Sequence, residues 1–340
     1  MPERAGSILL WALGSFLLAA ALILLPNLVS LSQQEILVLL VINVLLVTSY
    51  RLLTLTGEWS LAHVVIMGVG AYGSALVSKK LALPVPLSML AGASIAALLA
   101  FLLSFPLFRM KGFYFLIGSF AAGEVIRLIW KWSDLTWLFG GPKGIKLIPP
   151  FPDIGLFSIE FYDPVNYYYL CLMVVAISLV ILYRVEHSRI GLTFHAIHWQ
   201  DKLAESVGVS TFRYRTLAFV ISAFFTGLAG ALLAHYMTAV SPHVFGLSQM
   251  LAVMVWAIVG GIGGFAGPIV GAVVLSLLDE SLRGFEEYRP GVYGLLLILS
   301  VMFFPKGLRG LPEQLGPIAG RVVRSMKKQL ISRVGERPAA

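Results

Sequence analysis

The stretch LPVPLSMLAGASIAALLAFLLSFPLF fills residues 83–108 and contains no Asp, Glu, Lys or Arg. A helix needs roughly 20 apolar residues to cross a hydrocarbon core about 30 Å thick, because each residue advances it by about 1.5 Å. The stretch is therefore long enough to span a bilayer. Apolar runs recur on both sides of it, so this segment indicates the architecture of the whole chain.

The overall composition agrees with a chain that lies mostly in lipid. Hydrophobic residues make up 58% and charged residues 12% of the 340 residues, and the mean hydropathy is +0.88. Too few polar residues remain to cover a soluble surface, so we predict an integral membrane protein. We expect one polytopic all-α bundle over residues 1–310 with about ten transmembrane helices, at residues 8–31, 35–54, 60–78, 83–108, 113–132, 167–183, 216–240, 249–263, 267–282 and 292–304.

Two basic segments orient the predicted spans. The loop at residues 184–215 and the tail at residues 311–340 are both rich in Lys and Arg, which favours the cytoplasmic side. Six spans before the loop and four after it then place both termini in the cytoplasm. Lys79, Lys80 and Arg127 would lie on the outer side, against the general bias. The tail is expected to rest near anionic membrane lipid.

Several classes of function are excluded by what the chain lacks. The net charge of +8 does not indicate nucleic-acid binding, because the basic residues lie between and after spans rather than on a soluble module. The single Cys171 rules out an internal disulfide, and neither a Cys/His cluster nor a phosphate-binding loop is present. We therefore expect no catalytic residues, no metal site and no cofactor bound by this chain.

The loop at residues 184–215 contains a predicted amphipathic helix at residues 194–207. His195, His198 and Glu205 fall on its polar side, and Gly208 follows as a helix stop. Such a helix can dock into a groove of another protein, or it can lie on the membrane surface. The two histidines lack further ligands at suitable spacing, so a metal site is not favoured.

The segment at residues 133–166 contains GGPKGI and PPFP, whose Gly and Pro density predicts a non-helical loop on the outer side. It is either a plain connector or a docking surface at the outer mouth. GVGAYG at residues 68–73 has the spacing of a dinucleotide-binding loop, but it lies inside an apolar span. Small residues at this spacing favour close packing between helices in lipid instead.

Five ordered motifs carry a resemblance to a known family: GEWSLAH at residues 57–63, KGFYF at 111–115, GGPKGI at 140–145, AESVGV at 204–209 and VGGIGGFAGP at 259–268. Together they resemble permeases of the LivM type, which belong to branched-chain amino acid ABC importers of the bacterial inner membrane. The resemblance implies a second permease subunit, two ATPase subunits that use ATP, and an extracytoplasmic solute-binding protein. It also implies an ATPase-coupling loop containing Gly191, His195, Ala196, Ile197, His198, Ala204, Glu205 and Gly208.

The chain also departs from the family pattern. His195 and His198 stand where arginines are usual, and Trp59 and Ala62 stand where leucine and glycine are usual. The ATPase partner is then expected to be adapted to this loop. The family also includes transporters proposed for urea and short amides, so the resemblance leaves the solute open between these and branched-chain or other small amino acids.

Polar residues at membrane depth are candidates for the solute path, because lipid exposure would cost each several kcal/mol. The candidates are Asn43, Ser60, His63, Tyr72, Tyr114 and Glu124. Each can instead form a hydrogen bond between helices, and Glu124 is one turn from Arg127, with which it can pair. An alternative from a different class is an ion- or proton-coupled transporter that uses Glu124 and His63 as titrating groups.

Overall fold

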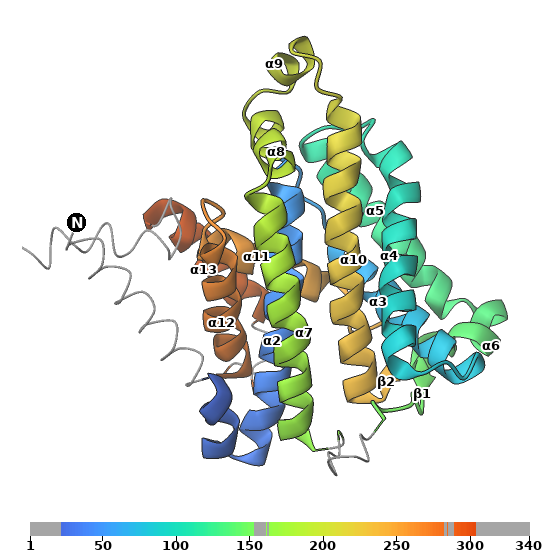
Figure 1. The fold of residues 1–340 in the computed structure, drawn as a ribbon. Helices are drawn as coiled ribbons and strands as arrows, with labels where there is room; N and C mark the ends of the chain where they lie inside the picture. The colour runs from blue at the N-terminus through green and yellow to red at the C-terminus, as the bar shows by residue number, and fades with distance from the viewer. Residues whose placement is uncertain (1–21, 153–160, 162, 282–283, 285–288, 304–340) are drawn as a thin grey trace, which may run out of the picture.

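The computed structural model describes residues 22–152, 161, 163–281, 284 and 289–303. These residues form a bundle of α-helices with one short two-stranded sheet (Figure 1), so the predicted all-α membrane fold is confirmed for this part of the chain. The longer helices are α2 (Leu31–Thr54), α3 (His63–Lys80), α4 (Val85–Leu107), α5 (Phe113–Lys131), α7 (Pro164–Glu186) and α10 (Thr211–Met237). The shorter ones are α6 (Thr136–Phe139), α8 (Arg189–Trp199), α9 (Asp201–Ser206), α11 (Leu247–Gly260), α12 (Ala266–Ser281) and α13 (Arg289–Phe303).

Helices α2 and α10 form the centre of the bundle. Helix α10 packs against α2, α3 and α4, and α2 also packs against α7 and α12. In the most apolar window of α2 and of α10, 72% of the residues are buried inside the chain, against 33% in α4 and α7 and 22% in α5. The outward apolar faces of α4, α5 and α7 are therefore the ones available to lipid or to another membrane subunit.

Glycine allows α3 and α10 to cross in close contact. A Cβ atom at Gly70 of α3 would overlap the backbone of Gly227, and one at Gly230 of α10 would overlap the carbonyl oxygen of Met67. The helix backbones touch directly at these positions, which is how small residues hold helices together where lipid provides no hydrophobic drive. The glycines at residues 68–73 are thus helix-packing residues, as predicted.

Five described helices are long and apolar enough to cross a membrane, namely α2, α4, α5, α7 and α10. Helices α11, α12 and α13 have 14, 16 and 15 residues, so each is shorter than a straight crossing requires. The predicted span at residues 8–31 lies mostly outside the described residues, as does the basic tail at residues 311–340. The count of about ten spans therefore stays a prediction.

The segment between α10 and α11 is folded back into the bundle. Strand β2 (Ala239–Val240) is followed by a non-helical stretch in which Phe245 is buried. Its ring packs against Tyr72 of α3 and Trp130 of α5. Irregular backbone within a membrane domain is tolerated where protein rather than lipid surrounds it. The chain therefore reaches α11 through a non-helical segment that packs on α3 and α5.

The two ends of the bundle differ. Helices α8 and α9 lie at one end, and α6, β1 (Ile145–Lys146) and β2 lie at the other (Figure 1). Strands β1 and β2 pair antiparallel, which joins the glycine- and proline-rich loop to the chain after α10. Lys79 and Lys80 lie at this second end, where their ammonium groups donate to the carbonyls of Lys146 and Trp137, at 2.6 and 3.2 Å. The two lysines therefore have hydrogen-bond partners at the end of the bundle that is opposite α8 and α9.

Candidate functional site

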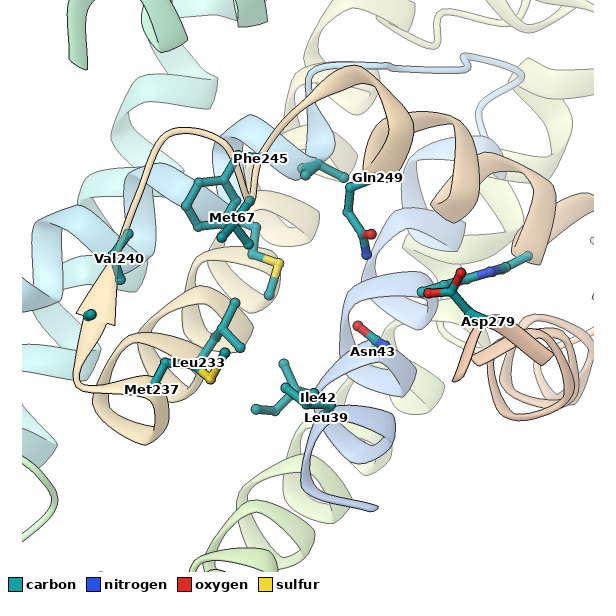
Figure 2. A pocket seen from close by; sticks show the side chains of 14 residues that line it. Leu39, Ile42, Asn43, Met67, Leu233, Met237, Val240, Phe245, Gln249 and Asp279 are labelled. Atoms are coloured by element: carbon teal, nitrogen blue, oxygen red, sulfur yellow. The ribbon is translucent and has the colours of Figure 1, made fainter. Parts of the chain in front are cut away.

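A cavity of about 240 Å³ lies between α2, α3, α10, α11 and α12 (Figure 2). Its wall is mostly apolar, with three polar side chains, Asn43 of α2, Gln249 of α11 and Asp279 of α12. In Figure 2 these three lie on one side of the space, and Leu233 and Val240 lie on the other. The cavity is therefore amphipathic, with separate regions for the polar and apolar parts of a solute.

Asn43 is the one predicted path residue that lies on the cavity wall. Its amide donates to Ser276 Oγ of α12 at 3.3 Å, which joins two walls of the cavity. Gln249 and Asp279 were missed by the sequence reasoning. Both residues stand near the ends of apolar runs, where a polar residue is normally interpreted as lying at the membrane surface. The one sequence feature that could have indicated a role in the cavity is that both runs are short for a membrane crossing.

His63, Ser60 and Tyr72 contribute to the packing around the cavity rather than to its wall. His63 Nε2 lies 2.7 Å from Ser222 Oγ of α10, so it links α3 to α10. Ser60 Oγ accepts from the backbone N–H of Ala62, at 3.2 Å, just before α3 begins. The Tyr72 ring stacks on Trp130 with centroids 4.6 Å apart.

Tyr114 and Glu124 lie on α5, away from the cavity wall. Tyr114 is 73% exposed on the chain. Glu124 pairs with Arg127 one turn later, with 2.6 Å between Oε2 and Nη2. The structure thus forms the ion pair that the spacing indicated, and this carboxylate is held by its own helix.

The predicted amphipathic helix at residues 194–207 is wrong in its extent. The structure has two helices instead, α8 and α9, and Gln200 between them is extended, with φ −154° and ψ 96°. Helix α8 begins earlier than predicted because Ser188 Oγ accepts from the backbone N–H groups of Ile190 and Gly191, at 3.2 and 3.4 Å. Gly208 ends the unit with φ +87°, which agrees with the expected stop.

Each of the two helices has an inner and an outer face. Gly191, Phe194, Ile197 and Ala204 are buried against the bundle. Four large apolar side chains are instead mostly exposed: Leu192, Trp199, Leu203 and Val207. We call these four residues the tip patch. A patch of this kind at the end of a membrane domain indicates contact with another surface.

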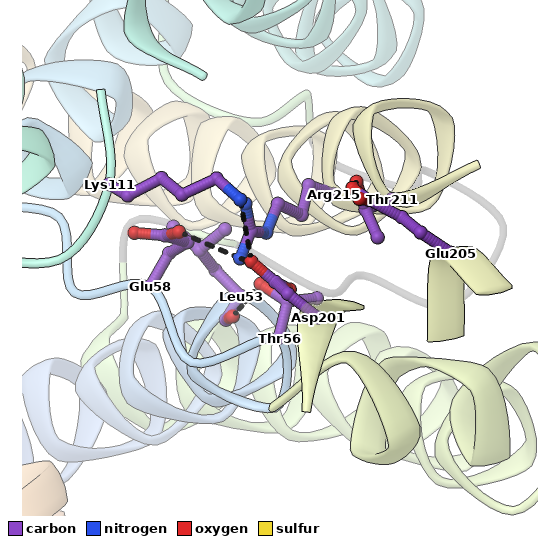
Figure 3. A network of polar contacts seen from close by, with 8 residues as sticks. All are labelled: Leu53, Thr56, Glu58, Lys111, Asp201, Glu205, Thr211 and Arg215. Carbon is purple, nitrogen blue, oxygen red and sulfur yellow. Dashed lines mark hydrogen bonds and ion pairs between the residues drawn. The ribbon is translucent and has the colours of Figure 1, made fainter. Parts of the chain in front are cut away.

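A network of charges holds α9 against the bundle (Figure 3). The Arg215 guanidinium donates to both carboxylate oxygens of Asp201, at 2.8 and 2.7 Å, and lies 3.3 Å from Glu58 Oε1. Lys111 Nζ lies 3.0 Å from Asp201 Oδ2. Burial raises the pKa of Glu58, and the nearby Arg215 partly opposes that rise. Asp201, the first residue of α9, is thereby tied to α10 and to the loops before α3 and α5.

A second ionic contact joins the end of α7, just before α8, to α2. The Arg51 guanidinium of α2 donates to both carboxylate oxygens of Glu186, the last residue of α7, at 3.0 and 2.6 Å. It also donates to the carbonyl oxygen of Ile262, in the turn between α11 and α12. A movement of the α7–α8 junction therefore bears directly on α2 and on the α11–α12 turn.

His195 on α8 is half-buried, and burial lowers the pKa of its imidazole below the usual 6.5, opposed by the nearby Glu186. His198 lies against the loop before α3, since a Cβ at Gly57 would be 3.2 Å from His198 Nδ1. The imidazoles of His195 and His198 therefore lie in different surroundings, the first near Glu186 and the second beside Gly57. Among the described residues no group of three or more His, Cys, Asp or Glu side chains is arranged to hold a metal ion.

Comparison with known proteins places this architecture in a family. The model of the family described as branched-chain amino acid transport system / permease component matches residues 32–303. This range covers the cavity, both charge networks and the α8–α9 unit. The chain belongs to this family of membrane permease components.

Two relatives illustrate the likeness. The high-affinity branched-chain amino acid transport system permease protein LivM of Escherichia coli (strain K12) is 29% identical over 307 residues, which cover 83% of this chain and 71% of the relative. The permease protein LivH of the same organism is 31% identical over 131 residues, covering 38% of this chain and 42% of the relative. No solved structure matches the chain.

Proposed function

We propose that this chain is a permease subunit of an ATP-driven importer that carries branched-chain amino acids across the inner membrane into the cytoplasm. The observation that carries the proposal is the family match over residues 32–303. The chain is a transport component rather than an enzyme. ATP is hydrolysed in separate ATPase subunits, and a solute-binding protein delivers the amino acid from the outer side.

The second permease of the assembly is proposed to be a sibling chain rather than a copy of this one. The relatives of this chain include both LivM and LivH permeases, and the LivM likeness covers far more of the chain. A LivM-type chain paired with a LivH-type chain is the simplest assembly that uses both. The apolar outer faces of α4, α5 and α7 offer membrane surface for such a pairing.

The end that carries α8 and α9 is proposed to be the cytoplasmic end, with both chain termini on the same side. The tip patch supplies apolar contact area for an ATPase subunit. Asp201 and Glu186 connect the patch to α10, α2 and the α11–α12 turn through the ionic contacts described above. A push on α8 and α9 then reaches helices that line the cavity.

The coupling role is tested with Glu205→Arg and Gly208→Pro. Glu205 Oε1 accepts from Thr211 Oγ1 at 2.7 Å, and Gly208 has a φ of +87° that proline does not adopt. Both changes are expected to leave the protein in the membrane and to lose co-purification of the ATPase. Asp134→Arg makes a charge reversal at the opposite end of the bundle and serves as the control.

The assay is co-expression with the neighbouring transport genes, followed by purification and measurement of ATP-dependent leucine uptake in vesicles. Uptake that is normal in both variants would refute the coupling role of α8 and α9. A purified chain that never carries an ATPase would instead favour ion-coupled transport.

A further inference from the structure

The indole N–H of Trp256 is the feature that points to a ligand in the cavity. Trp256 lies on α11, lines the cavity and is 1% exposed. Its Nε1 atom has no hydrogen-bond partner among the described residues. An indole nitrogen is a donor only, and a buried donor without a partner costs about 1–3 kcal/mol. A solute that accepts this hydrogen bond removes that cost.

The polar side of the cavity has the chemistry of both ends of a zwitterion. The Asn43 and Gln249 amides line the same cavity as Trp256 and supply further N–H donors, and a carboxylate accepts such bonds. The Asp279 carboxylate, on the neighbouring α12, supplies a charge of the sign that an ammonium group requires. Transfer of a zwitterion out of water is costly unless both charges find partners, and this wall provides both kinds.

The opposite side of the cavity suits an aliphatic side chain. Leu233 and Val240 form part of this wall and bring no charge to it. Each buried methylene contributes about 0.8 kcal/mol, so a branched side chain gains more here than a methyl group does. The volume of about 240 Å³ is several times the roughly 30 Å³ that one water occupies, so a solute of several heavy atoms has room.

A second cavity adjoins this space on the side of the bundle end that carries β1 and β2. It measures about 490 Å³ and shares Leu39, Met237 and Asp279 with the first. Toward the α8–α9 end, α2 and α10 are joined by the 2.8 Å hydrogen bond between Ser49 and Thr226. The two adjoining cavities therefore lie on the β1–β2 side of this contact between α2 and α10.

We infer that the cavity between α2, α3, α10, α11 and α12 is a binding site within this chain for an α-amino acid with an aliphatic side chain, held by Trp256, Asn43 and Gln249 at its carboxylate and by Asp279 at its ammonium group. The inference rests on the proposed function and adds the site and the residues. It makes the permease itself selective, in addition to any solute-binding protein.

The first test removes the indole donor alone. Trp256→Phe keeps an aromatic ring, and the loss of a hydrogen bond to a charged group is expected to lower leucine uptake by roughly 10-fold or more in vesicles that hold the complete importer. Trp137→Phe makes the same replacement at a side chain that is 72% exposed outside the cavity, and uptake is expected to stay unchanged. Leucine uptake by Trp256→Phe equal to that of Trp137→Phe would overturn the inference.

The second test measures occupancy without transport. Val244→Cys places a thiol at a half-exposed position on the cavity rim, and the native Cys171 is buried and gives little background. Leucine is expected to slow thiol labelling of the purified complex, and urea is expected to leave it unchanged. Labelling that leucine does not slow would overturn the inference even if Trp256→Phe fails to fold.

The two tests separate the site from the proposed function. Leucine uptake by the unmodified importer, together with unprotected labelling, leaves the function standing and rejects the site. An importer that takes up no branched-chain amino acid rejects the proposed function, and protection of the thiol by leucine would still support the site.

Discussion

The buried ion pair between Arg51 and Glu186 leads to a stability prediction of definite size. The two side chains are 2% and 8% exposed, and the guanidinium also donates to the Ile262 carbonyl. Arg51→Met leaves the Glu186 carboxylate buried without a counter-charge and the carbonyl without its donor. Breaking a buried pair in this way costs about 3–5 kcal/mol, because the remaining charge is neither solvated nor paired.

The assay is the temperature at which the detergent-purified protein loses its monodisperse elution profile. In soluble domains 1 kcal/mol moves the melting temperature by about 2–4 °C, so Arg51→Met is expected to lower it by roughly 10 °C. Lys111→Met is the matched control. Lys111 is 59% exposed in its pair with Asp201, and such surface pairs contribute about 0–1 kcal/mol.

A double variant separates charge pairing from packing. Glu186→Leu alone leaves the Arg51 guanidinium buried without a counter-charge, whereas Arg51→Met combined with Glu186→Leu removes both charges of the pair. The double variant is expected to be more stable than the sum of the two single losses predicts. Strictly additive losses, or an Arg51→Met variant as stable as Lys111→Met, would refute the reasoning.

Three further predictions concern other parts of the bundle. Gly230→Leu is expected to prevent α3 and α10 from packing and to abolish folded protein in the membrane, because its Cβ would overlap the Met67 carbonyl. The control is Gly294→Leu, which is expected to express normally because a Cβ at this position meets nothing within 4 Å. Burial raises the pKa of Glu58 above its ordinary 4.5, so the native state binds the proton more tightly than the unfolded state does. The stability of the protein relative to Glu58→Gln is therefore expected to fall as the pH rises above about 4.5. Melting temperatures of both proteins, measured from about pH 5 to pH 8, check the direction of this change. His235→Phe removes the 2.7 Å contact between His235 Nδ1 and the carbonyl oxygen of Pro149, and the loss is expected to cost about 1–3 kcal/mol. Faster proteolysis of the loop that contains Pro149 is the measurement.

Much of the architecture could be predicted from local sequence. An uncharged run such as residues 83–108 must be buried in lipid or protein, so its helical state follows from hydropathy alone. The packing role of the glycines at residues 68–73 also followed, because the absence of a side chain has the same steric meaning wherever it occurs. The Glu124–Arg127 pair followed from helical spacing.

The segment that forms α8 and α9 could be predicted only in part from its own residues. The amphipathic pattern at residues 194–207 predicted one helix, but the helix is interrupted at Gln200, and the next residue, Asp201, pairs with Arg215 and Lys111. Those partners come from α10 and from the loop before α5. The residue pattern within the segment contains no information about these distant partners. Neither the break nor the charge network could therefore be predicted from the segment alone.

The sequence by itself determined that the chain is a membrane-embedded bundle of α-helices with a basic loop at one end, because burial of apolar residues and the side-chain spacing of a helix are local properties. Only the tertiary structure decided that Asn43, Gln249, Trp256 and Asp279 line one cavity, while His63 and Ser60 support the helices around it. Those cavity residues lie on α2 and on the pair α11 and α12, which is far from α2 in the chain. Their meeting depends on how α2, α11 and α12 pack, and that packing is settled by contacts across the whole bundle rather than within any one segment.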